Sequence, residues 1–246
     1  MTVVAVIPVR GASKGVRGKN LRQVGGVSLV ARAVIAARSS LAIDRVIVST
    51  DDAAIALEAT SAGAEIVERP AGLANDTASS ESALLHALDS LDQPVDVLVF
   101  LQATSPFIDV AALEVAIARV LGGIHDVVFS AVESHSFLWT ADAGGVNHDP
   151  RIRQRRQDRE PQFRETGAFY VLRAAGFRGA GHRFFGSVGL AIVDDRTALE
   201  IDTEVDLEFA NAIAPSIDGR LDGRIEDGID IEKWGESWSY PSAAGR

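Results

Sequence analysis

Short, uninterrupted runs of β-branched and other apolar residues recur along this chain, and they constrain its fold more than any other feature. Residues 3–9, 45–50 and 95–101 carry such runs, in which apolar and polar side chains do not alternate. A strand of that kind is buried on both faces, as in a parallel sheet. Between the runs, apolar residues such as Ala33 and Ala37 recur at helical spacing. Strands that alternate with helices predict right-handed crossovers and a largely parallel α/β sheet.

The same alternation continues along the chain and is then interrupted once. We expect further helices over 51–62, 79–91, 109–121 and 204–212, and further strands over 64–68, 126–132, 168–172 and 187–193. Helix caps are expected at Ser79 or Ser80 and at Asp109. A polar stretch with Trp139 and a cluster of five arginines within 151–159 predicts an inserted flap over 133–166. The core domain then covers 1–214, and an acidic arm over 215–246 docks on another surface or is mobile.

Composition limits the classes of partner. The 246 residues carry a net charge of −10, so nucleic acid and anionic membranes are disfavoured as main partners. There is no cysteine, which removes disulfides and thiolate chemistry. The sequence contains no apolar run long enough to span a membrane, and its start lacks the features of a signal peptide. We therefore expect a cytoplasmic protein.

The loop over 10–20 is the first candidate site, because it follows a buried strand at the edge where α/β proteins bind ligands. It holds three glycines and four cationic side chains, a mixture that can bind a polyphosphate through backbone N–H groups and positive charge. Ser13 stands where a P-loop needs glycine, and no dinucleotide fingerprint can be read. The alternative is a solvated basic loop.

Two other stretches place polar groups at predicted strand ends. Residues 101–106 follow the strongest predicted strand, where they form either part of a site or a turn. If residues 200–202 end a strand, Glu200 and Asp202 share one face and can hold Mg²⁺. The alternative, favoured by spacing alone, is that Asp202 or Thr203 caps a helix. The arginine cluster before Arg164 indicates an anion site or pairing with acidic surface.

Taken together, these pieces resemble the bacterial N-acylneuraminate cytidylyltransferases, or CMP-sialic acid synthetases, over residues 1 to about 214. Single pieces are weak signals, but their order and spacing are specific. The pieces are Arg10-x-x-Ser13-Lys14-Gly15 with Lys19-Asn20; Val48-Ser49-Thr50-Asp51; Arg69-Pro70-Ala71-x-Leu73-Ala74-x-Asp76-Thr77-Ala78-Ser79-Ser80; Leu101-Gln102-x-Thr104-Ser105-Pro106; Arg156-Gln157; Arg164-x-x-Gly167-Ala168-x-Tyr170; and Ile201-Asp202-Thr203-Glu204-x-Asp206-Leu207.

This resemblance implies a fold, a reaction and a set of residue roles. The fold is a mainly parallel, Rossmann-like nucleotidyltransferase sheet with helices on both faces and an inserted dimerisation flap, hence a homodimer. The reaction joins CTP and a nine-carbon acidic sugar to give a CMP-sugar and pyrophosphate, with Mg²⁺ as cofactor. The nucleotide would be bound by Arg10, Ser13, Lys14, Lys19, Asn20, Arg69 and Ser80, and the acceptor by Gln102, Arg156, Arg164, Thr166 and Tyr170. Asp202 and Glu200 would bind the metal, and Arg10, Lys19, Arg164 and Asp202 form the implied catalytic set.

The chain also departs from the family pattern. Glu200 stands where the family usually has aspartate, Thr166 where it has asparagine, and Ala103 where it often has proline. These departures leave two other functions open: a catalytically silent sugar-nucleotide binding protein, and a cytidylyltransferase for another acceptor such as a 3-deoxy-octulosonate.

Overall fold

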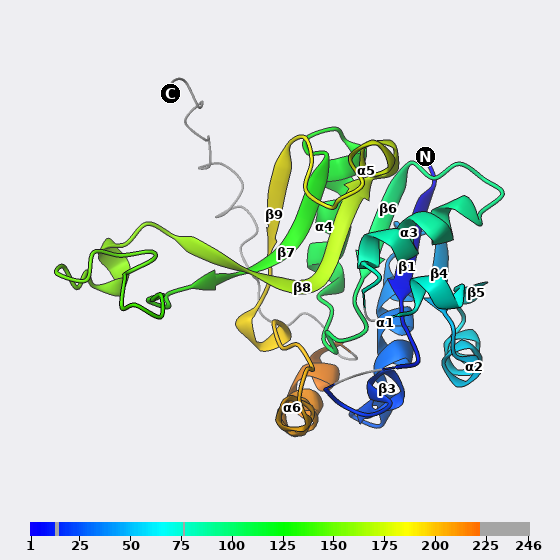
Figure 1. The fold of residues 1–246 in the computed structure, drawn as a ribbon, viewed down its shortest axis with the longest axis horizontal. Helices are drawn as coiled ribbons and strands as arrows, with labels where there is room; N and C mark the ends of the chain where they lie inside the picture. The colour runs from blue at the N-terminus through cyan, green and yellow to red at the C-terminus, as the bar shows by residue number, and fades with distance from the viewer. Residues whose placement is uncertain (13–14, 76, 222–246) are drawn as a thin grey trace.

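The centre of the molecule is a seven-stranded sheet with the order β5-β4-β1-β6-β8-β7-β9 (Figure 1). This computed structural model describes residues 1–12, 15–75 and 77–221. The strands are β1 Val3–Pro8, β4 Arg45–Thr50, β5 Glu65–Glu68, β6 Val97–Leu101, β7 Val127–Ser134, β8 Gln162–Arg173 and β9 Val188–Ile192. Neighbouring strands are parallel except where β8 pairs with β6 and β7. The mainly parallel sheet is confirmed, with one reversed strand that the sequence pattern did not indicate.

The central strands are buried on both faces, as their composition predicts. Along β1, Ala5 and Ile7 point into one apolar layer, whereas Val4 and Val6 point into the other. Helices α1 (Leu29–Ser39), α2 (Ala53–Ser61) and α4 (Val110–Leu121) pack in the first layer, and α3 (Ser80–Asp89) and α5 (Ala174–Ala180) in the second. Helices therefore cover both faces, and the loops that follow the parallel strands gather at one edge.

Side-chain caps fix where the helices begin at that edge. Ser79 accepts a hydrogen bond from the backbone N–H of Ser82 and caps α3. Asp109 caps α4 in the same way through Ala112. Both caps confirm the sequence prediction. The cap at Ser79 places Ser80 at the start of α3, beside the end of β1.

Helix α6 (Glu204–Leu221) is longer than the predicted 204–212 and runs through Pro215. A proline removes one helical hydrogen bond, but packing offsets this loss, because Ala214 and Ile217 are buried. They lie in a third apolar cluster with Val24 of a short hairpin. The hairpin strands are β2 Gln23–Val24 and β3 Val27–Ser28. The first residues of the predicted arm are thus helical, and 222–246 lie outside the described residues.

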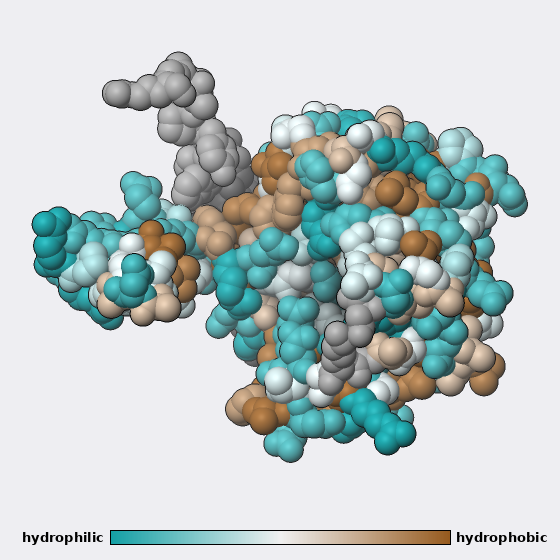
Figure 2. Space-filling model, in the orientation of Figure 1, coloured by the Kyte–Doolittle hydropathy of each residue, from teal (hydrophilic) through white to brown (hydrophobic). Residues whose placement is uncertain are grey.

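Strands β7 and β8 run on past the sheet and carry residues 135–161, which we call the lobe (Figure 1). The lobe lies within the predicted flap and includes a short 3-10 helix, Arg156–Asp158. At its centre the Phe137 ring lies between the guanidinium carbons of Arg153 and Arg159, 3.9 Å and 4.1 Å from the ring centroid. Its surface is mostly hydrophilic but has an apolar patch (Figure 2). In the described part of the chain, no helix has both the length and the apolar character to cross a bilayer.

Candidate active site

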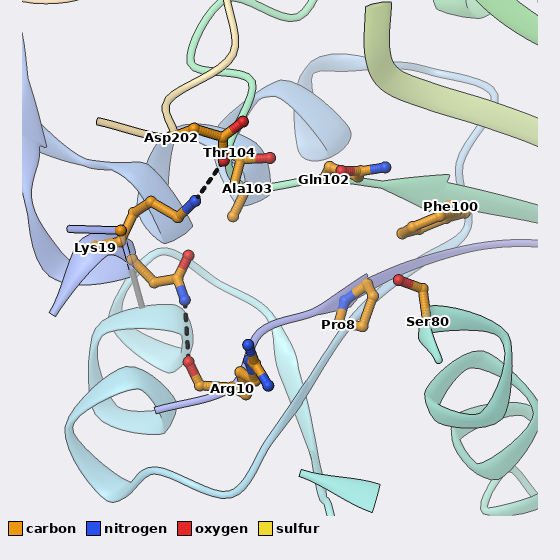
Figure 3. A pocket seen from close by; sticks show the side chains of 11 residues that line it. Pro8, Arg10, Lys19, Ser80, Phe100, Gln102, Ala103, Thr104 and Asp202 are labelled. Atoms are coloured by element: carbon orange, nitrogen blue, oxygen red, sulfur yellow. Dashed lines mark hydrogen bonds and ion pairs between the residues drawn. The ribbon is translucent and has the colours of Figure 1, made fainter. Parts of the chain in front are cut away.

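A cavity of about 320 Å³ lies at the carboxyl edge of the parallel strands, where β1 and β6 end (Figure 3). Its lining residues are Pro8, Arg10, Gly15, Lys19, Asn20, Ser80, Phe100, Gln102, Ala103, Thr104 and Asp202. We call the part formed by Lys19, Asn20 and Asp202 the carboxylate end, and the part formed by Ser80, Phe100 and Gln102 the aromatic end. Figure 3 shows the two on opposite sides of the cavity.

The basic loop after β1 forms one wall of the cavity, as predicted for a ligand-binding loop. The Asn20 side chain donates to the carbonyl oxygen of Arg10 at 3.0 Å, which ties the two ends of the loop together. A Cβ atom on Gly15 would lie 2.1 Å from the carbonyl oxygen of Asp202, so only glycine allows this close approach. Ser13 and Lys14 lie outside the described residues, so their predicted roles stay predictions.

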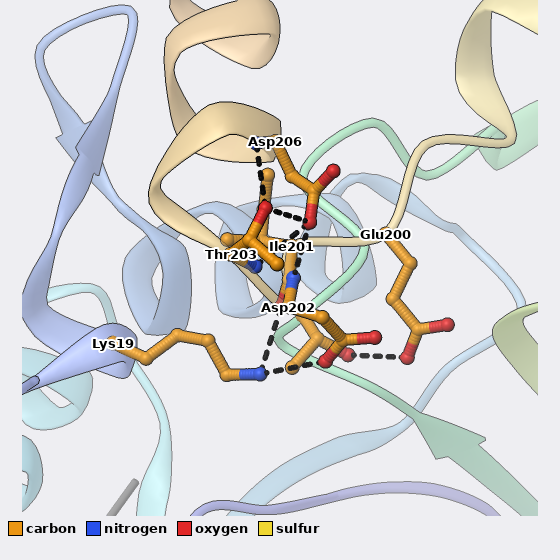
Figure 4. Close-up of polar contacts among 7 residues, drawn as sticks. Lys19, Glu200, Ile201, Asp202, Thr203 and Asp206 are labelled. Carbon is orange, nitrogen blue, oxygen red and sulfur yellow. Dashed lines mark hydrogen bonds and ion pairs between the residues drawn. The ribbon is translucent and has the colours of Figure 1, made fainter. Parts of the chain in front are cut away.

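Lys19 joins this loop to the carboxylates (Figure 4). Its Nζ donates to the carbonyl oxygen of Ile201 at 2.7 Å and to Asp202 Oδ1 at 3.1 Å. The Lys19 side chain is 14% exposed, whereas that of Asp202 is 69% exposed. The ammonium group is thus held from one side, and the Asp202 carboxylate remains open to a ligand.

The start of α6 settles which residue caps this helix. Thr203 Oγ1 accepts from the backbone N–H of Asp206 at 3.2 Å, and Asp206 Oδ2 accepts from the backbone N–H of Thr203 at 2.7 Å. This reciprocal arrangement is a capping box. Thr203 is therefore the cap, and Asp202 is not needed for it. Residues 200–202 do not end a strand, so the capping alternative that the spacing favoured is confirmed, with Thr203 as the cap.

Glu200 lies beside Asp202 and completes a carboxylate pair. Its Oε1 accepts from the Thr104 hydroxyl at 3.3 Å. Part of Glu200 is open to solvent. Burial of its carboxyl by surrounding protein atoms, and then the negative charge of Asp202, raise the pKa of this carboxyl. The positive charges of Lys19 and Arg164 lower it, but by less. Within the described residues, no third carboxylate or histidine completes a metal site with this pair. The donor set nevertheless fits Mg²⁺, which often uses one or two carboxylates together with phosphate oxygens and water.

The reversed strand β8 brings a second group of predicted residues to the same edge. Because β8 is antiparallel, its first half, with Arg164 and Thr166, lies where the parallel strands end. Gly167 has φ 75°, a left-handed backbone conformation that favours glycine, and a Cβ atom there would be in ordinary van der Waals contact with the side chains of Gln102 and Glu200, at 3.7 Å and 3.6 Å.

Two predicted acceptor residues on β8 face protein groups. Thr166 is buried, and its hydroxyl donates to Ser130 Oγ at 2.6 Å. Tyr170 is buried and stacked on Phe100, with 5.3 Å between ring centroids, and its hydroxyl donates to Glu165. Tyr170 therefore does not line the cavity itself but supports the Phe100 ring, which does.

Three predicted arginines, Arg69, Arg156 and Arg164, are not among the residues that line this cavity. Arg69 is 6% exposed and donates to the Ser49 carbonyl oxygen at 2.5 Å, and its burial lowers the pKa of the guanidinium. Arg156 lies in the lobe. Sequence reasoning also missed lining residues, among them Pro8 and Phe100, because both read only as parts of buried strands.

A mainly parallel sheet whose carboxyl edge holds a cationic loop beside paired carboxylates is typical of an α/β protein that binds a nucleotide at this edge. The chain belongs to the cytidylyltransferase family, whose model matches residues 4–187.

Named relatives and a solved structure agree with this assignment. The chain is 34% identical to N-acylneuraminate cytidylyltransferase A of Danio rerio over 178 residues, 70% of this chain and 41% of that protein. It is 27% identical to the pseudaminic acid cytidylyltransferase of Campylobacter jejuni, over 85% of this chain and 95% of the other. The fold is similar to that of CMP:2-keto-3-deoxy-manno-octonic acid synthetase in complex with CTP, with a TM-score of 0.68, 15% identity and coverage of 88% of this chain and 99% of that one.

Proposed function

We propose that this protein transfers the cytidylyl group of CTP to a nine-carbon acidic sugar and releases pyrophosphate. The observation that carries the proposal is the contact between Lys19 of the basic loop and Asp202 of the carboxylate pair within one cavity. Relatives whose names specify N-acylneuraminate and pseudaminic acid support an acidic sugar as the acceptor.

In the proposed reaction, the anomeric hydroxyl oxygen of the sugar attacks the α-phosphorus of CTP. A new oxygen–phosphorus bond forms, and the bond to the pyrophosphate oxygen breaks in line with it. Both substrates are anions, so positive charge is needed to bring them together. Arg10 and Lys19 would stabilise the phosphates, and Arg164 would act near the acceptor carboxylate.

The carboxylate pair would have two roles: to hold a metal ion beside the phosphates and to accept the proton of the attacking hydroxyl. Asp202 and Glu200 would hold Mg²⁺, which supplies positive charge to the phosphate oxygens when bound. The proton of the attacking hydroxyl would leave to a carboxylate at this edge, for which Asp202 is the candidate because it is open to the cavity.

We further propose that the protein is a homodimer formed through the lobe. Leu138, Trp139, Val146 and Ile152 of the lobe are between 49% and 60% exposed. Apolar side chains flanked by arginines are typical of interfaces. In such a dimer, Arg156 of one subunit would act in the cavity of the other. We also propose a cytoplasmic location, since the reaction consumes CTP and the chain has no cysteine.

An assay of pyrophosphate release with each of the four nucleoside triphosphates tests the proposed function. Sialic acid, another nine-carbon acidic sugar and a 3-deoxy-octulosonate serve as acceptors. We expect release that requires both CTP and a nine-carbon acid. Release with the octulosonate alone would instead assign the other acceptor, and CTP binding without release would identify a silent binding protein.

A further inference from the structure

A half-buried ion pair borders the aromatic end of the cavity. Arg183, in the loop between α5 and β9, donates from Nε to Glu81 Oε1 at 2.8 Å. The two side chains are 18% and 19% exposed. Glu81 follows Ser80, which lines the cavity, at the start of α3. The pair therefore lies next to the site, although the two residues are 102 positions apart in the sequence.

The guanidinium group of Arg183 also lies on aromatic rings. Its central carbon is 4.7 Å from the ring centroid of Tyr170 and 5.0 Å from that of Phe100. Phe100 itself lines the cavity. These cation–π contacts and the Glu81 hydrogen bond together hold the guanidinium beside the aromatic end.

The Arg183 guanidinium has more N–H hydrogen-bond donors than its protein contacts use. A guanidinium carries five N–H donors; in the described part of the chain Arg183 uses Nε on Glu81 and also interacts with the Tyr170 hydroxyl, and no second carboxylate pairs with its terminal nitrogens. Burial opposes the charged form, but the hydrogen bond and charge of Glu81 outweigh it and raise the pKa of Arg183. The group is thus a permanent cation with an orientation set by its neighbours and with unused donors.

We infer that Arg183 is a specificity-determining residue for the acceptor, and that its terminal N–H groups bind oxygen atoms of the acidic sugar at the aromatic end. This inference rests on the proposed function. Glu81 is the positioning residue, because it orients the guanidinium without needing to touch the sugar. The phosphates of CTP would lie at the carboxylate end, with Lys19, so Arg183 should affect the acceptor and not the nucleotide.

A purely structural role for Arg183, fastening its loop to α3, makes a different prediction. The chain offers a matched control in the ion pair between Arg178 of α5 and Asp89, the last residue of α3. That pair also ties the α5 region to α3, but at the end of the helix away from Ser80, and neither residue lines the cavity.

The test compares Arg183→Gln, Arg183→Lys, Glu81→Gln and Arg178→Gln by steady-state pyrophosphate release. For Arg183→Gln we expect the KM of the acidic sugar to rise about tenfold or more, while the KM of CTP stays within about twofold. Arg183→Lys should recover part of the loss, and Glu81→Gln should raise the sugar KM less than Arg183→Gln does. Arg178→Gln should leave both constants unchanged.

An unchanged sugar KM in Arg183→Gln would overturn the inference. So would a parallel change in both KM values, or changes that Arg178→Gln reproduces. If the wild-type protein releases no pyrophosphate, the proposed function fails, and calorimetric titration with sialic acid then decides the inference separately. Weaker binding by Arg183→Gln than by wild type would support it, and equal binding, or no binding by either, would overturn it.

Discussion

The two ends of the cavity are built in different ways. At the carboxylate end, polar groups from the basic loop and from the start of α6 contact each other directly, as Lys19 and Asp202 do. At the aromatic end, an apolar ring, Phe100, lines the cavity, and the charged groups Arg183 and Glu81 stand behind or beside it. In the proposed reaction this difference corresponds to a division of work: the carboxylate end would act on the phosphates, and the aromatic end would select the sugar.

Removing a cation from the carboxylate end should have the largest effect. We expect Lys19→Ala to lower turnover by more than about 100-fold, since one lost charge contact to the developing phosphate charge is worth about 3 kcal/mol of barrier. Arg10→Ala should also lose most activity. Neither change leaves a cavity in the apolar core, so both variants should fold. Steady-state pyrophosphate release and thermal melts measure the two effects.

Arg22 provides the control for this experiment. It pairs with Glu204 at 2.8 Å but does not line the cavity, so Arg22→Ala should keep normal turnover. If Lys19→Ala also keeps normal turnover, then the carboxylate end does not carry the chemistry, and the proposed division of work is wrong.

Asp202→Asn and Thr203→Ala separate metal binding from helix capping. Because Thr203 forms the cap, Asp202→Asn should leave the melting temperature of the metal-free protein almost unchanged. It should raise the Mg²⁺ concentration needed for half-maximal activity by about tenfold or more. Glu200→Gln should raise it less. A titration of activity with Mg²⁺ measures all three variants.

Thr203→Ala should behave in the opposite way, with about 1 kcal/mol lost from the free energy of unfolding and the same Mg²⁺ dependence as wild type. An Asp202→Asn variant that melts lower but needs no more Mg²⁺ than wild type would contradict the metal assignment.

These effects also show what could be predicted from sequence. The parallel core was predictable, because a short apolar run such as residues 97–101 is typical of a strand buried on both faces. The direction of β8 was not predictable, because residues 168–172 have the same local pattern in either direction. A proline usually ends a helix, but the tertiary packing of Ala214 and Ile217 keeps α6 helical through Pro215.

For the site, the residues of the carboxylate end could be proposed from motifs, but the contact between Lys19 and Asp202 could not. The two residues are 183 positions apart, and only the fold brings them together. Arg183 and Glu81 at the aromatic end belong to no motif that we recognised. An ion pair between distant elements leaves no periodic signal in the sequence, so this part of the site required the structure.

The lobe is a third region of the molecule, and its proposed role in dimerisation is tested by measuring self-association of the protein. Trp139→Asp should weaken the proposed dimer, since it puts a charge into an apolar contact. We expect a shift toward monomer in light scattering at micromolar concentration. Phe209→Asp is a matched control, because Phe209 is 60% exposed on α6, outside the lobe. A wild-type monomer with full activity would exclude this role of the lobe.

The smallest expected effect is on the pH dependence of stability at the aromatic end. Burial alone would raise the pKa of Glu81, but the hydrogen bond and charge of Arg183 outweigh it, so this pKa lies below its usual value of 4.5. A lowered carboxyl pKa stabilises the folded state above the usual value, and this contribution is lost as the pH falls through the lowered value. Glu81→Gln should therefore melt below wild type at pH 7.

That difference should shrink as the pH falls below about 4.5. Thermal melts of both proteins across this range measure it, with Asp89→Asn as the control for a more exposed partner in an ion pair. A difference that does not change with pH would mean that the charge of Glu81 contributes nothing to stability.

The measurement that tests the central claim most directly follows the α-phosphorus of CTP. The protein is incubated with Mg²⁺, a nine-carbon acidic sugar and CTP labelled with ³²P at the α-position, and the products are separated. We predict that the label moves to a CMP-sugar while unlabelled pyrophosphate is released, and that no label moves when the sugar is left out. Label that stays in CTP, or that appears only in free CMP, would contradict cytidylyl transfer to the sugar.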